Sequence, residues 1–323
     1  LSFCTLLLFI FHYKVMADCD DNASPICWIS PDENGHVHVN STVPPGGFCK
    51  CPSLRSVSFG EDVKSIKADM FRNCPKLMYV NFSANIEFID RDAFEGCDAI
   101  NSISIPDSVY QIGRAAFSSC QNLKSVNIGN GVKFIERYAF YRNFNLQTLI
   151  LGKKVFSIQS HAFQLSAITE LVLPPTVEIV GTSAFQGAMN LRSVEIGNSD
   201  IITVDEGAFA YALSLTQITV RAREVDLKTS SIADTPLLSS IIFNKSITRI
   251  SGLDSRFYKA YACDTTSTKP GKCGCREGYE NLMLPSSPFF TCSPCAPGFS
   301  NGAIAEQGLC QPCTLGRYAN GIA

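Results

Sequence analysis

A repeat of 23 residues runs through the middle of this 323-residue chain and constrains its fold more than any other feature. The unit LRSVSFGEDVKSIKADMFRNCPK, which begins at Leu54, is followed in register by LMYVNFSANIEFIDRDAFEGCDA and INSISIPDSVYQIGRAAFSSCQN. Nine such units can be followed, of which one is a residue short and one a residue long. A period of this length is typical of solenoids, in which each unit forms one coil and stacked neighbours bury its apolar face.

Apolar residues hold fixed positions within each unit. The first, fourth and sixth positions are apolar, as at Ile100, Ile103 and Ile105, and the last two alternate as in a strand with one buried face. A turn and two further apolar residues come next. We interpret a recurring Ala–Phe pair after them as a short helical turn whose phenylalanine fills the core. These pairs begin at Ala93, Ala116, Ala139, Ala162, Ala184 and Ala208.

This pattern resembles the treponemal, or BspA-like, class of leucine-rich repeats over about residues 54–256. The resemblance implies an α/β repeat solenoid, a right-handed coil of short strands and short helical turns. It also implies a surface or secreted protein that takes part in adhesion or in contact with a host or partner. The final units depart from the pattern, since Ser231-Ile232 replaces Ala–Phe and the pair then disappears. Such decay is expected of a terminal cap.

The N-terminus and the fifteen cysteines indicate the secretory pathway. Residues 1–11 form an apolar run that is too short to span a bilayer and suits the core of a signal peptide, so we expect residues 1–17 to be removed. The alternative is that Met16 is the true start of the protein. Because disulfides persist in oxidising compartments, the cysteine content independently favours an extracellular or cell-surface location.

The cysteines fall into groups with different expected roles. Residues 18–53 are predicted to form an N-terminal cap stapled by two disulfides with three possible pairings, drawn from Cys19, Cys27, Cys49 and Cys51. Residues 54–260 form the predicted solenoid. Within it, Cys74, Cys97 and Cys120 share one repeat position, and we expect buried free thiols that behave as small hydrophobic residues.

Residues 261–323 are predicted to form small disulfide-rich modules. Their disulfide candidates are Cys263, Cys273, Cys275, Cys292, Cys295, Cys310 and Cys313. The two Cys-x-x-Cys pairs come close to zinc-ribbon spacing, which leaves a metal site as an alternative. A Gly-aromatic pair after each cysteine pair looks instead like the ephrin-receptor-like and tumour-necrosis-factor-receptor-like modules, which implies loops stapled by disulfides.

Seven is an odd number of C-terminal cysteines, and the final module stops abruptly. We therefore expect the chain to be the N-terminal part of a longer protein, with a membrane anchor beyond Ala323. The alternative is a complete secreted protein in which Cys263 pairs with a repeat cysteine or with another chain.

Motifs for catalysis are absent from the sequence. There is no Gly-rich phosphate loop after a strand and no G-x-S-x-G, and His36 and His38 alone make a weak metal site. The net charge of −2 comes with scattered lysines and arginines, whereas nucleic-acid binding needs a concentrated basic face. We predict no enzyme activity, no cofactor, no metal and no small-molecule substrate.

Outward-pointing strand residues of a solenoid line one continuous face, and this face is the predicted binding surface. It is hydroxyl-rich in the early units and becomes apolar and acidic at Ile150, Glu170, Val172 and Glu195. We expect a protein or glycan partner there, with a basic protein loop as a suitable ligand. Predicted glycosylation sequons begin at Asn22, Asn40, Asn81 and Asn244.

The function predicted from these observations is extracellular recognition or adhesion. Two alternatives stay open: a structural component of a matrix or wall, and the non-catalytic ectodomain of a larger receptor or enzyme.

Overall fold

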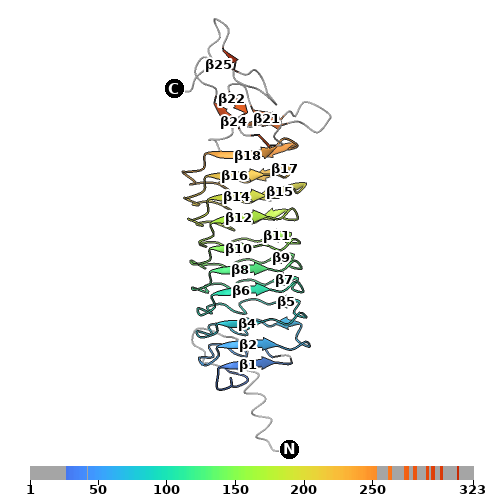
Figure 1. The fold of residues 1–323 in the computed structure, drawn as a ribbon, viewed down its shortest axis with the longest axis vertical. Helices are drawn as coiled ribbons and strands as arrows, with labels where there is room; N and C mark the ends of the chain where they lie inside the picture. Colours follow the sequence, from blue (N-terminus) through green and yellow to red (C-terminus); the bar gives the residue numbers. More distant parts are fainter. Residues whose placement is uncertain are drawn as a thin grey trace, which may run out of the picture.

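The computed structural model describes residues 27–41 and 43–252, together with the backbone of short strands between residues 261 and 312. The chain forms a stack of coils in which strands from successive units lie one above another (Figure 1). Each of the nine repeat units contributes one strand to a first face and one strand to a second face, and the segment before Leu54 adds one more strand to the first face. The described residues form a parallel β-solenoid of about nine turns.

The first face is built by the strand at the start of each unit. These strands pair in parallel in three groups, β1-β2-β4, β6-β8-β10 and β12-β14-β16-β18. The pairing between first-face strands is interrupted between β10 and β12. The connection that leads into β12 is one residue shorter than usual, since Ser166 and Ile168 are one residue closer in sequence than the equivalent residues Asn143 and Leu146. The bounds are β1 His36–Val39, β2 Ser56–Phe59, β4 Tyr79–Asn81, β6 Ser102–Ile105, β8 Ser125–Ile128, β10 Thr148–Ile150, β12 Glu170–Leu173, β14 Ser193–Ile196, β16 Gln217–Val220 and β18 Ser240–Asn244.

The second face is one continuous parallel sheet of nine strands. Each strand includes the second apolar residue that follows the turn, and this residue is buried in every strand except β19, where Ile250 is partly buried. The bounds are β3 Ser65–Ile66, β5 Phe88–Ile89, β7 Gln111–Ile112, β9 Phe134–Ile135, β11 Ser157–Ile158, β13 Ile179–Val180, β15 Ile201–Val204, β17 Glu224–Leu227 and β19 Arg249–Ser251.

The predicted helical turns, and with them the α/β class, are wrong: the described residues contain no helix. The Ala–Phe segment hydrogen-bonds to the next coil and not along itself, as when the Phe117 amide donates to the Ala139 carbonyl at 2.8 Å. Each coil also places two residues four positions apart at positive φ, such as Ala115 at 52° and Ser119 at 58°. Positive φ at these positions produces tight turns and interrupts right-handed helix geometry.

The core of the stack is a column of phenylalanines, as the repeat predicts. Eight buried rings stack face to face with centroid separations between 5.0 and 5.5 Å. The rings belong to Phe48, Phe71, Phe94, Phe117, Phe140, Phe163, Phe185 and Phe209. The column begins before Leu54, so the segment that carries the N-terminal cysteines adds a ring and strand β1 to the solenoid.

The cysteine ladder has the predicted character. Cys74, Cys97 and Cys120 are free and fully buried. Each thiol donates to the carbonyl of the core phenylalanine one coil earlier, as Cys97 Sγ does to Phe71 at 3.0 Å. Burial raises the pKa of Cys74 and of Cys120 to about 12. Asn143 fills the same position in the next coil and donates its amide to the Phe117 carbonyl at 2.9 Å.

Additional links occur at both ends of the described solenoid. At the N-terminal end, Cys27 and Cys51 form a disulfide, and Cys49 is also disulfide-bonded. At the C-terminal end, β18 pairs antiparallel with β23, which reverses the direction of every earlier pairing in the stack. The remaining short strands pair antiparallel as β20-β21, β22-β24 and β25-β26. Their bounds are β20 Tyr261–Cys263, β21 Cys273–Cys275, β22 Tyr279–Asn281, β23 Phe289–Phe290, β24 Cys292–Pro294, β25 Phe299–Ser300 and β26 Gln311–Pro312.

Several predictions fall beyond the described part of the chain. These are the signal peptide, Cys19, Asn22 and the side chains of the C-terminal cysteines. Within the described residues, no helix has the length and apolar character needed to cross a membrane.

Candidate binding surfaces

The third and fifth residues of each unit, which are the first and third of its first-face strand, point outward, and we call this surface the strand face. Ile150 is 56 % exposed and Val172 is 60 % exposed, so the apolar pair predicted from the sequence lies at the surface. Ile150 is the last residue of β10, and Val172 lies within β12. These two strands come from successive coils of the stack (Figure 1). Glu170 is exposed on the same strand as Val172. The structure therefore brings three of the predicted binding residues together.

Glu195 differs from the other three predicted residues. It lies opposite Val172 in the β12–β14 register, but its carboxylate accepts a hydrogen bond from Arg221 Nε at 2.7 Å. Both side chains are about two-fifths exposed, and the guanidinium of Arg221 offsets the negative charge of the Glu195 carboxylate. The acidic character of the patch therefore rests on Glu170, which forms no ion pair within the described residues.

The histidines in β1 pair with serines of the next coil. His36 and His38 each lie 2.8 Å from a hydroxyl, on Ser56 and Ser58 respectively. No group of three His, Cys, Asp or Glu side chains in the described part of the chain is placed to hold a metal ion. Of the sequon asparagines, Asn40 and Asn81 are exposed and Asn244 is half-buried in β18.

A second surface, which the sequence reasoning missed, follows the outer side of the nine-stranded sheet. Four aromatic rings from successive coils contact one another edge to face, and we call them the aromatic row: Phe88, Tyr110, Phe134 and Phe156. Their centroids are 6.2, 5.5 and 6.2 Å apart along the row. Tyr110 is 38 % exposed, and the Lys133 ammonium lies 5.3 Å from its ring centre.

A signal for the aromatic row exists in the sequence, but it does not keep to one repeat position. Phe88 and Phe134 come one residue before a buried isoleucine, whereas Tyr110 and Phe156 come two residues before one. The row therefore zigzags between two neighbouring positions. A search for identical residues at a fixed period overlooks this arrangement.

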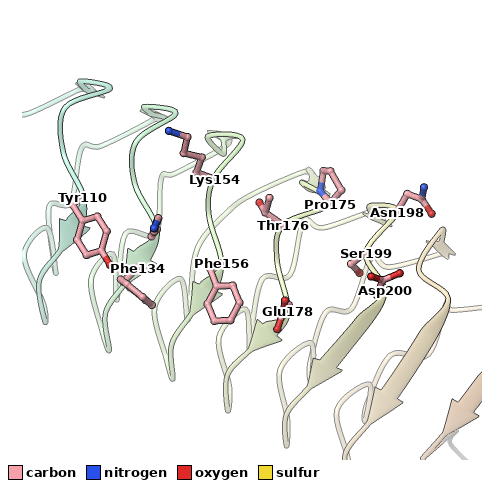
Figure 2. A pocket seen from close by; sticks show the side chains of 11 residues that line it. Tyr110, Phe134, Lys154, Phe156, Pro175, Thr176, Glu178, Asn198, Ser199 and Asp200 are labelled. Carbon is pink, nitrogen blue, oxygen red and sulfur yellow. The ribbon is translucent and has the colours of Figure 1, made fainter.

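Beside the aromatic row lies a groove of about 640 Å³, which we call the rim groove. Tyr110, Phe134 and Phe156 line one part of it, and Glu178 and Asp200 line the other. Figure 2 shows these side chains spread over successive coils, with Lys154 and Thr176 nearer the turns.

The rim groove rests on a rigid backbone. The amide of Lys133 donates to the Tyr110 carbonyl at 2.8 Å, that of Phe156 to Lys133 at 2.9 Å, and that of Glu178 to Phe156 at 3.0 Å. These hydrogen bonds join four groove residues into one ladder across four coils. Spacing between their side chains is therefore set by the stacking of the coils.

The far wall of the rim groove is made by the repeat unit that is one residue longer than the 23-residue period. Ile196 and Val204 are one residue further apart in sequence than Leu173 and Val180, and the extra residue lies in the turn that contains Asn198, Ser199 and Asp200. Ser199 is 5 % exposed, and its hydroxyl has no hydrogen-bond partner within the described residues. The irregular unit thus gives the groove a polar end.

Coils of parallel strands with a buried aromatic column define a solenoid of the leucine-rich-repeat class. The family model described as the BspA type leucine rich repeat region, with six copies, matches residues 41–168 and 157–260. These matches cover more than half of the chain, which therefore belongs to this family. No curated protein sequence matches the chain.

Solved structures similar to this chain are bacterial leucine-rich-repeat proteins. The Treponema pallidum leucine-rich-repeat protein is 18 % identical over 65 % of this chain and 86 % of its own, with a TM-score of 0.47. A leucine-rich-repeat protein from Bacteroides ovatus is 16 % identical over 69 % and 76 %, with a TM-score of 0.39. A leucine rich cell surface protein from Faecalibacterium prausnitzii is 16 % identical over 71 % and 93 %, with a TM-score of 0.27.

Proposed function

We propose that this protein is an extracellular recognition or adhesion module that binds a protein partner through the strand face. The observation that carries the proposal is the exposed pair Ile150 and Val172, which are more than half accessible on strands β10 and β12 of successive coils. Large apolar side chains exposed together on an ordered surface favour a protein interface, because their burial against a partner releases water.

The surroundings of this pair support a protein partner of modest basic character. Glu170 lies on the same strand and is exposed, while Glu195 is already compensated by Arg221. A partner loop that places one lysine or arginine beside an apolar contact would match this arrangement. The disulfide between Cys27 and Cys51 supports an oxidising, extracellular compartment.

The test is binding of the full chain, purified from a secreting host, to candidate partner cells by flow cytometry. The double variant Ile150→Ser with Val172→Ser should lose most of the binding, and Glu170→Lys should weaken it without a change in thermal stability. Met189→Ser is the matched control, because Met189 is 53 % exposed but lies in a turn outside the first-face strands. Equal binding by the double variant and the control would refute the proposal.

A further inference from the structure

We propose that the rim groove is a second binding site, separate from the strand face, and that its ligand is an uncharged polysaccharide lying across successive coils. The site combines an aromatic floor, a balanced set of charges and an irregular polar end. The proposal stands on these features alone and does not depend on the strand face.

The aromatic floor is the first feature. Tyr110, Phe134 and Phe156 line the groove from three successive coils; Tyr110 and Phe156 belong to the backbone ladder described above, and Phe134 follows its member Lys133. Ring faces carry a negative quadrupole and attract the weakly positive C–H groups on the face of a sugar ring. Neighbouring rings lie edge to face, at 67° between Tyr110 and Phe134 and at 73° between Phe134 and Phe156, so they offer a repeating polymer aromatic contacts of differing orientation along the stack.

The balance of charges is the second feature. Lys133 and Lys154 lie at the aromatic part of the groove, and Glu178 and Asp200 lie at the other part. Asp200 also lies 3.7 Å from the Arg223 guanidinium, which is outside the groove lining, so the lining itself carries no net formal charge. A strongly anionic or cationic polymer therefore gains no overall attraction here, whereas an uncharged one is not repelled at either end.

The polar groups also discriminate between a sugar chain and a proline-rich peptide, the other ligand that aromatic grooves commonly bind. Glu178 has no ion pair within the described residues and offers only acceptors when ionised. A polyproline chain has no backbone N–H to donate, so it would leave the carboxylate of Glu178 desolvated without a donor. Sugar hydroxyls both donate and accept, and they match carboxylates, ammonium groups and the Asn198 amide together.

The shape of the groove agrees with a chain-like ligand. Its residues extend over coils from Tyr110 to Asp200, and Figure 2 shows their side chains arranged along the stack. The extra residue in the turn around Ser199 closes one end with a buried hydroxyl that has no partner in the described residues. A ligand of several linked sugar rings would run along the floor and meet this polar end.

The experiment measures binding of the full chain to uncharged hexasaccharides by isothermal titration calorimetry, up to millimolar concentration. The probes are cellohexaose, laminarihexaose, mannohexaose and chitohexaose, with hexagalacturonic acid and decaproline as charged and peptide comparisons. At least one uncharged hexasaccharide should bind, and Tyr110→Ala should weaken it by about tenfold, the loss expected from removing one aromatic contact.

Matched variants separate ligand contact from folding. Tyr110→Phe keeps the ring and should retain binding, whereas Glu178→Ala changes an exposed side chain and should weaken binding several-fold with no change in thermal midpoint. Tyr79→Ala removes an aromatic residue that is 68 % exposed on the strand face and should leave the affinity unchanged. Failure of every uncharged hexasaccharide to bind would overturn the proposal. So would sugar binding that survives both Tyr110→Ala and Glu178→Ala, or decaproline binding that needs the same residues.

Discussion

Replacing Phe117 by alanine tests whether the phenylalanine column holds the solenoid together. Phe117 is fully buried between Phe94, at a ring separation of 5.0 Å, and Phe140, at 5.2 Å, with interplanar angles of 6° on both sides. Loss of a buried phenylalanine costs about 3–5 kcal/mol, because the transfer free energy is lost and a cavity remains. Each stacked pair adds about 0.5–1.5 kcal/mol.

The matched variant is Phe209→Ala at the end of the column. Phe209 stacks on Phe185 at 5.5 Å, and Ile232 takes the ring position in the following coil. Phe117→Ala should therefore cost about 0.5–1.5 kcal/mol more than Phe209→Ala, which is the contribution of the second ring contact. Ser104→Ala changes an exposed side chain on β6 and should cost less than about 0.5 kcal/mol.

Urea denaturation followed by far-ultraviolet circular dichroism measures these differences as shifts in midpoint. A solenoid can unfold from its ends, so amide hydrogen exchange should accompany the titration. Protection should fall first in the coils around Phe117 in that variant. Equal midpoints for Phe117→Ala and Ser104→Ala would refute the idea that the rings couple one coil to the next.

Three further outcomes are expected. Gly207 has φ +64°, and a Cβ added there would have room, since its nearest neighbour would be Ser183 Oγ at 3.4 Å. Gly207→Ala should therefore lower the free energy of unfolding by about 1 kcal/mol through backbone strain alone. An unchanged urea midpoint would contradict this. Because burial raises the pKa of Cys97 well above its usual value, iodoacetamide should modify it only after denaturation, as judged by mass spectrometry of its peptide. Hydrogen bonds from Lys228 and Ser251 lower the pKa of Asp226, so the stability it contributes should be present above pH 3.8 and disappear as pH falls through the folded-state pKa. Thermal midpoints of wild type and Asp226→Asn should accordingly converge in acid.

The sequence predicts the buried part of this fold well, because packing imposes a strict period on it. Ile103, Ile105 and Phe117 recur at fixed positions since each must meet its equivalent in the next coil. The buried thiols of Cys74, Cys97 and Cys120 follow from the same argument.

The backbone of the turns was harder to predict. Ala115 and Leu165 adopt positive φ although neither residue favours it, so local preference gives no warning that the Ala–Phe segment avoids a helix. Hydrogen bonds between coils, such as that from the Phe117 amide to Ala139, override the local preference. These contacts join residues a whole unit apart and are therefore invisible to a reading of one segment.

On the candidate surfaces, too, features set by the repeat were predictable, whereas features set by individual side-chain contacts were not. Exposure of Ile150 and Val172 follows from strand alternation, and the structure has both side chains outward. Pairing of Glu195 with Arg221 was not expected, because it depends on the conformations of two surface side chains. The rim groove was missed because it combines a zigzag of aromatic residues with a single extra residue near Ser199.

Reversal of direction at the last coil has a consequence for assembly. A stack of parallel strands has no natural length, since its final strand offers the same row of unpaired amides and carbonyls that received each earlier coil. In this protein β23 runs antiparallel to β18 and pairs with its last two residues, Phe243 and Asn244. A second molecule that added a parallel strand to β18 would have to displace β23 from these two positions.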